Sequence, residues 1–126
     1  MTVHLDTSLL IDALCVPHRS LDRLEKLAAS SHRPAISNPV LYEWLRGERR
    51  DYELQAQERV VPSHDAVAFD DNAARTAARI YRALPRARGR EIDIAIAACA
   101  IEDGAMLWTL NPADFEDIPG LTLYRG

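Results

Sequence analysis

The segment at residues 92–103 constrains the fold more than any other part of the chain, because it is apolar on nearly every side. Its centre consists only of isoleucine, alanine and cysteine, and Gly104 follows it directly. A helix of this composition has to be covered all round by the rest of the protein. We therefore predict a buried helix here, whose small side chains permit close packing against several other elements.

Short β-type runs alternate with helical patterns along the rest of the chain. The predicted strands are residues 3–5, 34–37, 67–69, 105–109 and 121–124. One predicted helix begins after Asp6. The others cover residues 20–30, 40–46, 48–59 and about 71–84, and the helix at 48–59 is expected to be exposed. Such alternation is typical of an α/β protein with a mostly parallel sheet and helices on both faces. The length of 126 residues predicts a single domain, residues 1–126.

The composition excludes several classes of protein. With 48% hydrophobic and 27% charged residues it is that of an ordinary globular protein. No apolar run approaches the roughly 20 residues that span a bilayer. The first residues lack the features of a signal peptide, so a cytoplasmic protein without a membrane partner is expected. Two cysteines, Cys15 and Cys99, make neither a disulfide framework nor a zinc site.

Four acidic residues stand where strands end or helices begin. Asp6 follows the first predicted strand, Asp114 follows the strand at 105–109, Asp93 opens the apolar helix, and Glu43 lies in the helix after the second strand. Ligands of open α/β sheets bind beyond the carboxyl ends of the strands. Carboxylates gathered there repel one another unless a cation joins them, and hard oxygen ligands suit Mg²⁺ or Mn²⁺.

Each of these acids also has a structural interpretation. Asp6 could cap the following helix, and Asp93 in a first helical turn is favoured by the helix dipole. Glu43 could be a solvated helix residue, although its neighbours look buried. Asp114 stands three residues after Asn111 and could complete a capping arrangement. Only the joint placement of the four favours a shared site.

Arginine dominates the basic residues, since Lys26 is the only lysine among fifteen. Arginine suits bidentate phosphate contacts, and a GC-rich genome would give the same bias. The net charge of −4 argues against a general nucleic-acid coat protein, yet residues 72–90 contain no acid. This stretch is either a solvated face or a strip that holds RNA phosphates through Arg82, Arg86, Arg88 and Arg90.

Four segments around the acids resemble, in order, the motifs of PIN domains. They are Leu5-Asp6-Thr7-Ser8, Ser37-Asn38-Pro39 with Glu43-Trp44-Leu45-Arg46-Gly47, Gly89-Arg90-Glu91-Ile92-Asp93 with Ile96-Ala97-Ala98, and Leu107-Trp108-Thr109-Leu110-Asn111 with Asp114-Phe115. Each motif alone is weak, but together they cover nearly the whole chain. Length and motif set most resemble the VapC-type toxins.

The resemblance implies a three-layer α/β/α domain that cleaves RNA endonucleolytically with Mg²⁺ or Mn²⁺. It implies a homodimer and inhibition by a small cognate antitoxin, as in type II toxin–antitoxin modules. Asp6, Glu43 and Asp93 carry over as catalytic, metal-binding acids. The fourth such acid is Asp114, or its position is filled by Asn111. Thr7, Thr109 and Asn111 carry over as supporting residues, the last two as helpers that hold water at the metal.

Two other functions remain open at this stage. A phosphoacceptor switch would receive phosphate on Asp6, but it usually needs a lysine near the pocket, and Lys26 lies in the second predicted helix. The other is a PIN-like interaction module without catalysis, against which the four retained acids argue. For an antitoxin, the region of Trp44 and the helix at residues 20–30 are the expected docking surfaces.

Overall fold

The computed structural model describes residues 1–126 and has a three-stranded parallel sheet at its centre. The strands are β1 (Thr2–Leu5), β2 (Arg33–Ala35) and β3 (Met106–Trp108), in the order β2-β1-β3. Val3 of β1 lies opposite Pro34 on one side and Met106 on the other. Since all pairs are parallel, the carboxyl ends of the strands meet at one edge. The predicted α/β class with a parallel sheet is confirmed.

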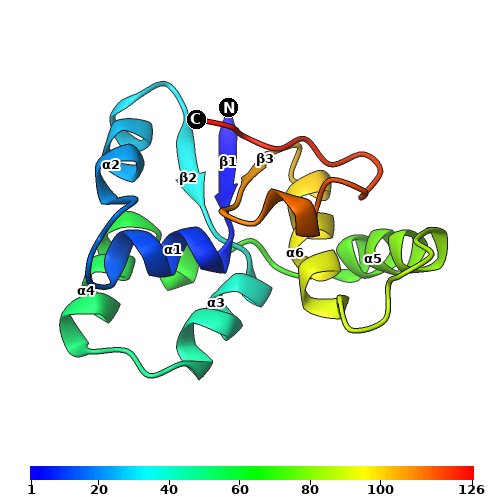
Figure 1. The fold of residues 1–126 in the computed structure, drawn as a ribbon, viewed down its shortest axis with the longest axis horizontal. Helices are drawn as coiled ribbons and strands as arrows, with labels where there is room; N and C mark the ends of the chain where they lie inside the picture. The colour runs from blue at the N-terminus through cyan, green and yellow to red at the C-terminus, as the bar shows by residue number, and fades with distance from the viewer.

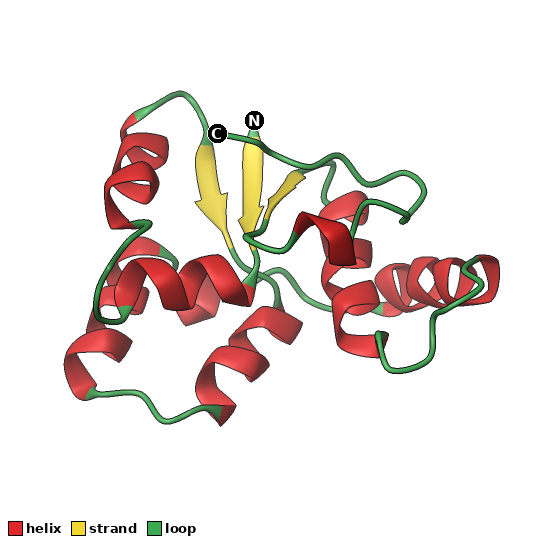
Figure 2. Ribbon diagram, in the orientation of Figure 1, coloured by secondary structure: helices red, strands yellow, loops and turns green.

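Helices flank this sheet on both sides (Figures 1 and 2). Helices α1, α2 and α4 lie on one side, and α6 lies on the other with α5 packed outside it. The helices are α1 (Thr7–Leu14), α2 (Leu21–Ala29), α3 (Asn38–Arg46), α4 (Asp51–Val60), α5 (Asp71–Ala83) and α6 (Glu91–Glu102). Two 3-10 turns, η1 (Ser63–Asp65) and η2 (Pro112–Asp114), complete the elements. None of the helices has both the length and the apolar character needed to cross a membrane.

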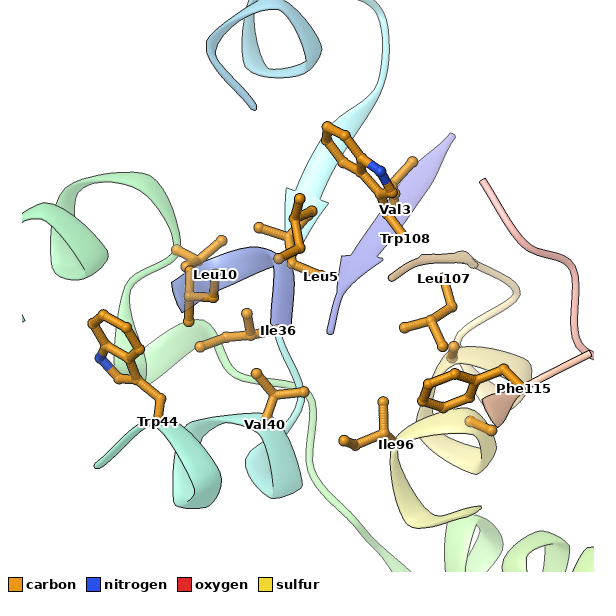
Figure 3. Packing of buried hydrophobic residues seen from close by; sticks show 14 of the residues in the cluster. Val3, Leu5, Leu10, Ile36, Val40, Trp44, Ile96, Leu107, Trp108 and Phe115 are labelled. Atoms are coloured by element: carbon orange, nitrogen blue, oxygen red, sulfur yellow. The ribbon is translucent and has the colours of Figure 1, made fainter. Parts of the chain in front are cut away.

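The buried apolar side chains form one cluster around the sheet. It contains 22 residues, which come from every helix except α4, from strands β1 and β3, and from the segments that connect the elements. Figure 3 shows side chains of α1 and α3, among them Leu10, Val40 and Trp44, on one side, and Ile96, Leu107 and Phe115 on the other. Helix α6 is covered as predicted over residues 96–100, which are at most 1% exposed, whereas Ile92, Ala95 and Ile101 are half-buried. Burial of this kind stabilises by roughly 25 cal/mol per Å².

Two predicted strands are wrong as strands. The segment around Val67 forms a single parallel bridge with Ser37, and the segment around Leu123 forms one with Leu107. Their backbones still pair locally, as in the hydrogen bond from the Tyr124 amide to the Leu107 carbonyl at 2.7 Å. Each therefore covers an edge of the sheet at one point, because an apolar run becomes a strand only where a partner runs beside it for several residues.

The prediction that residues 48–59 form an exposed helix is only half right. Helix α4 forms, but Glu53 and Gln57 on its inner face are 6% and 1% exposed. Both polar groups are satisfied: Glu53 accepts a hydrogen bond from the Arg50 amide at 2.7 Å, and Gln57 donates one to the Val61 carbonyl at 2.9 Å. Burial of a polar side chain is tolerated where its hydrogen bonds are made.

Three helix ends show how local residues bound the helices. Asp70 caps α5, accepting a hydrogen bond from the Ala73 amide at 3.0 Å. The N-cap of α3 is Ser37, and Asn38 is already helical. Gly47 ends α3 with φ −81°, so the left-handed conformation that favours glycine at helix ends is not used there.

Candidate active site

Asp6 leaves the end of β1 and is the N-cap residue of α1, but its side chain makes no capping hydrogen bond. Instead, the carboxylate Oδ2 accepts hydrogen bonds from the side chains of Ser8, through Oγ at 2.9 Å, and Thr109, through Oγ1 at 2.7 Å. The residue is only 5% exposed. Burial raises the pKa of Asp6 although the two hydroxyl donors oppose the rise, and the charge of Glu43 adds to it. The capping interpretation of its side chain is therefore wrong.

Ser8 and Thr109 join the start of the chain to its last part. The Leu110 amide donates to Ser8 Oγ at 3.2 Å, and the Asn111 amide donates to Thr109 Oγ1 at 3.0 Å. Thr109, predicted as a supporting residue, thus contacts Asp6 directly. Asn111 takes part only through its backbone. Ser8 was not among the predicted site residues, and its place two residues after Asp6 was the one available signal.

Glu43 lies in the middle of α3, where both carboxylate oxygens have donors. Oε1 accepts from Thr7 Oγ1 at 2.6 Å, and Oε2 lies 3.3 Å from a guanidinium nitrogen of Arg46. The side chain is 18% exposed, so Glu43 is not simply a solvated helix residue. The adjacent Trp44 is fully buried as expected, whereas Leu45, also expected to be buried, is 52% exposed.

Asp93 lies in the first turn of α6, and the charges of the other three acids affect its pKa. Burial, followed by repulsion from Asp6, Glu43 and Asp114, raises its pKa to about 6. Charge repulsion falls off within about 10 Å at ordinary ionic strength. The four predicted acids therefore lie in one neighbourhood, with Asp114 in the exposed turn η2 beyond β3.

The acids fit a divalent cation by their chemistry, although their present positions do not enclose one. No three histidine, cysteine or acidic side chains are grouped closely enough to hold a metal ion as they stand. Mg²⁺ usually keeps several waters and binds proteins through one or two carboxylates. A hydrated ion can thus be held by these hard oxygen donors without a closed cage. Its charge would relieve the repulsion that raises the pKa of Asp93.

The four predicted RNA-binding arginines fall into two groups. Arg82 on α5, and Arg86 and Arg88 in the following loop, are exposed and form no ion pair within the chain. Arg90 is already engaged, since its guanidinium contacts both carboxylate oxygens of Asp117 at 2.7 and 2.9 Å. RNA binding by any of the four stays a prediction.

One groove lies beside the acids, and none of the four acids lines it. It has a volume of about 420 Å³ and runs between α5 and α6, where Glu91 and Ile94 line it next to Asp93. Phe69 and Tyr81 line it too and are 40% and 39% exposed. Exposed aromatic side chains over a hollow are typical of surfaces that meet another molecule.

A family model for the PIN domain matches residues 3–121. The chain belongs to the PIN-domain family. The predicted resemblance is thus confirmed, and the acids described above belong to a PIN domain. No curated protein matches this chain.

Solved structures of similar fold are toxin–antitoxin complexes, in agreement with the resemblance to VapC-type toxins. VapBC2 from Rickettsia felis, bound to a DNA fragment from its promoter, has a TM-score of 0.79 and 24% identity over 98% of both chains. DNA-bound VapBC from Salmonella typhimurium has a TM-score of 0.77 and 25% identity over 98% of this PIN domain and 97% of that chain. VapBC-5 from Mycobacterium tuberculosis has a TM-score of 0.66 and 23% identity over 99% of this PIN domain and 98% of that chain.

Proposed function

We propose that this protein is a metal-dependent endoribonuclease and the toxin component of a type II toxin–antitoxin module. The observation that carries the proposal is the raised pKa of Asp93, which burial and three neighbouring acids hold near 6. Such a concentration of like charge is unfavourable unless a cation is bound, and strongly perturbed acids gather at functional sites. Membership of the PIN-domain family and the toxin–antitoxin complexes of similar fold support the same activity.

The side chains of the proposed site would have different roles. Asp6, Glu43, Asp93 and Asp114 would hold Mg²⁺ or Mn²⁺. Asp6 is held by two hydroxyl donors and Glu43 by one, so their carboxylates need little reordering when the cation binds. When bound, the cation would supply a water activated for attack on the phosphodiester and charge to stabilise the leaving oxygen. Hydrolysis of this kind leaves a 5′-phosphate and a 3′-hydroxyl.

RNA would approach over the exposed side of the acids. Asp114 and Asn111 are exposed, whereas Asp6 is deeply buried, so the substrate meets the site from the η2 side. Arg82 and Arg86 would bind flanking phosphates, since they are exposed and form no ion pair. Charge-assisted contacts to phosphate bring RNA to an otherwise negative protein.

We also propose two protein partners in the cytoplasm. A small antitoxin would cover the surface of α3 and α4, where Tyr42, Leu45 and Tyr52 are 57%, 52% and 44% exposed. The region of Trp44 thus stays an expected docking surface, although the Trp44 side chain is fully buried and its neighbours Tyr42 and Leu45 would make the contact. A second copy of the chain would pack on the groove between α5 and α6.

No observation favours the competing functions. A phosphoacceptor has to present its carboxylate to a phosphoryl donor, but Asp6 is 5% exposed and hydrogen-bonded to two hydroxyls. An interaction module without catalysis would have no reason to keep charges that raise the pKa of Asp93.

The decisive experiment is cleavage of a mixed RNA pool by the purified protein with Mn²⁺, with Mg²⁺ and with a chelator. Cleavage with either metal and none with the chelator is expected. Asp93→Asn should lose at least about 100-fold in rate, the usual scale for one strong electrostatic contributor. Asp22→Asn is the matched control, since it is an exposed helical aspartate outside the motifs. Parental cleavage by Asp93→Asn would refute the assignment.

The antitoxin is tested by co-expression with the small reading frame beside the gene. Growth arrest caused by this chain should be relieved, and the two proteins should purify together. The double variant Tyr42→Ser with Leu45→Ser should weaken that complex while cleavage of free RNA persists, because neither side chain is buried. Failure to bind the neighbouring product would remove the partner proposal without touching the nuclease.

A further inference from the structure

We propose that Arg90 is a positioning residue, which pairs with Asp117 and holds the turn that carries Asp114 against the start of α6, where Asp93 lies. This inference rests on the proposed nuclease site and deepens it. It assigns to Arg90 a role other than direct contact with RNA, and it gives Asp117 a role for the first time.

The contacts of the Arg90 guanidinium are unusually complete. Its two terminal nitrogens donate to the two carboxylate oxygens of Asp117 at 2.9 and 2.7 Å, a parallel fork. The same nitrogens also donate to the Asp114 carbonyl at 2.9 Å and the Arg86 carbonyl at 3.3 Å. An arginine has five N–H donors. Four are used here, so Arg90 has no second fork to offer to a phosphate.

The Asp114 carboxylate has no hydrogen bond of its own, so its position depends on the turn that carries it, which the buried Phe115 holds from one side. Helix α6 places Asp93 firmly, and Asp6 is held by Ser8 and Thr109. Asp114 instead closes the three-residue turn η2 and is exposed. Its own amide bonds only to the Asn111 carbonyl, at 3.0 Å. The contact from Arg90 to its carbonyl ties that turn to the beginning of α6.

The charges of Arg90 and Asp117 also fit a positioning role for Arg90. The Arg90 side chain is 21% exposed and that of Asp117 is 50% exposed. The hydrogen bond to Asp117 raises the pKa of Arg90, and the same contact lowers the pKa of Asp117. Arg90 also places a permanent positive charge near Asp93 and Asp114, which offsets part of their repulsion. It does so while its guanidinium is directed at Asp117, so it leaves the acids free for a cation.

The test measures cation binding separately from catalysis. Free Mn²⁺ is followed by its paramagnetic resonance signal with the full chain and no RNA, and kcat and KM are then measured with Mn²⁺. Arg90→Gln and Asp117→Asn should each weaken Mn²⁺ binding and lower kcat by about 10-fold, the low end of what residues that orient metal ligands contribute. KM for RNA should stay near the parental value.

Arg90→Lys and Arg88→Gln make the comparison specific. Lysine keeps the charge but cannot form the fork and reach Asp114 together, so Arg90→Lys should resemble Arg90→Gln. Arg88 is exposed in the same loop and forms no ion pair, so Arg88→Gln should bind Mn²⁺ like the parent. Asp117→Asn loses only an exposed carboxylate and is expected to fold, which circular dichroism checks.

Four outcomes would overturn the inference. Parental Mn²⁺ affinity in folded Asp117→Asn means that the pair does not position the site. A raised KM in Arg90→Gln with unchanged Mn²⁺ affinity means that Arg90 contacts RNA instead. A parental protein that neither binds Mn²⁺ nor cleaves RNA would remove the nuclease proposal together with this one, whereas an active parent with unaffected variants removes the positioning role alone.

Discussion

Replacing Asp93 by asparagine is expected to stabilise the metal-free protein at neutral pH. Burial and the neighbouring acids raise the pKa of Asp93 from 3.8 to about 6, so the folded state carries a disfavoured charge. A shift of this size corresponds to at most about 3 kcal/mol. Because the side chain is partly exposed, solvent screening leaves roughly 1–2 kcal/mol. In a domain of this length that is about 3–8 °C in Tm.

The pH dependence of this gain identifies its cause. Below about pH 4 Asp93 is protonated in both the folded and the unfolded state, so the variant should gain nothing. The unfolded chain loses this proton first, and the penalty on the parent grows between about pH 4 and pH 6. Above about pH 6 the penalty is complete. The difference in Tm between variant and parent should therefore grow from about pH 4 to about pH 6 and stay constant at higher pH.

Thermal unfolding with a chelator, from pH 4 to pH 8, measures this difference. Asp22→Asn is the control and should show no such window. Asp103 is unsuitable as a control, because its carboxylate lies 2.8 Å from the ring of the buried His4. A variant that unfolds below the parental Tm at pH 7.5, or whose gain is equally large at pH 4, would refute the reasoning and make Asp93 a structural residue.

Three further results are expected. Mn²⁺ should raise the Tm of the parent more than that of Asp93→Asn, because a ligand of the folded state stabilises by mass action; equal rises would contradict a shared cation site. Thr109→Val should leave Asp6 with one hydroxyl donor and the Asn111 amide without its acceptor, so it should lower the cleavage rate about 10-fold and the Tm by a few degrees; parental kinetics would argue against that role. Replacing Arg82, Arg86 and Arg88 by alanine should reduce the salt dependence of RNA binding, the slope of log affinity against log salt concentration, by about one unit per lost contact. An unchanged slope would mean that these arginines form a solvated face without contact to RNA.

The elements that the sequence predicted best are those defined by composition or by position at a strand end. Residues 92–103 could be read as a covered helix because no polar face exists there. The places of Asp6 and Asp93 followed from the rule that ligands meet the carboxyl edge of a parallel sheet. These features depend on local pattern, which a single sequence contains.

Features that depend on distant partners could not be predicted. The orientation of the Asp6 carboxylate is set by Thr109, which is 103 positions away in the chain. The pair of Arg90 with Asp117 spans 27 positions, and its arginine looked like any other in a basic strip. The exposure of Leu45 beside the buried Trp44 likewise depends on which face of α3 meets α1 and α6.

Both ends of the chain are needed to complete the acidic cluster. Asp6 follows β1, whereas Thr109 lies 103 positions later and, like Asp114, follows β3. A ribosome-bound chain that has not yet released this stretch lacks an edge strand, the hydroxyl that orients the first carboxylate, and the fourth acid. The proposed nuclease would therefore gain its activity only once the segment after β3 has been synthesised and β3 has paired with β1.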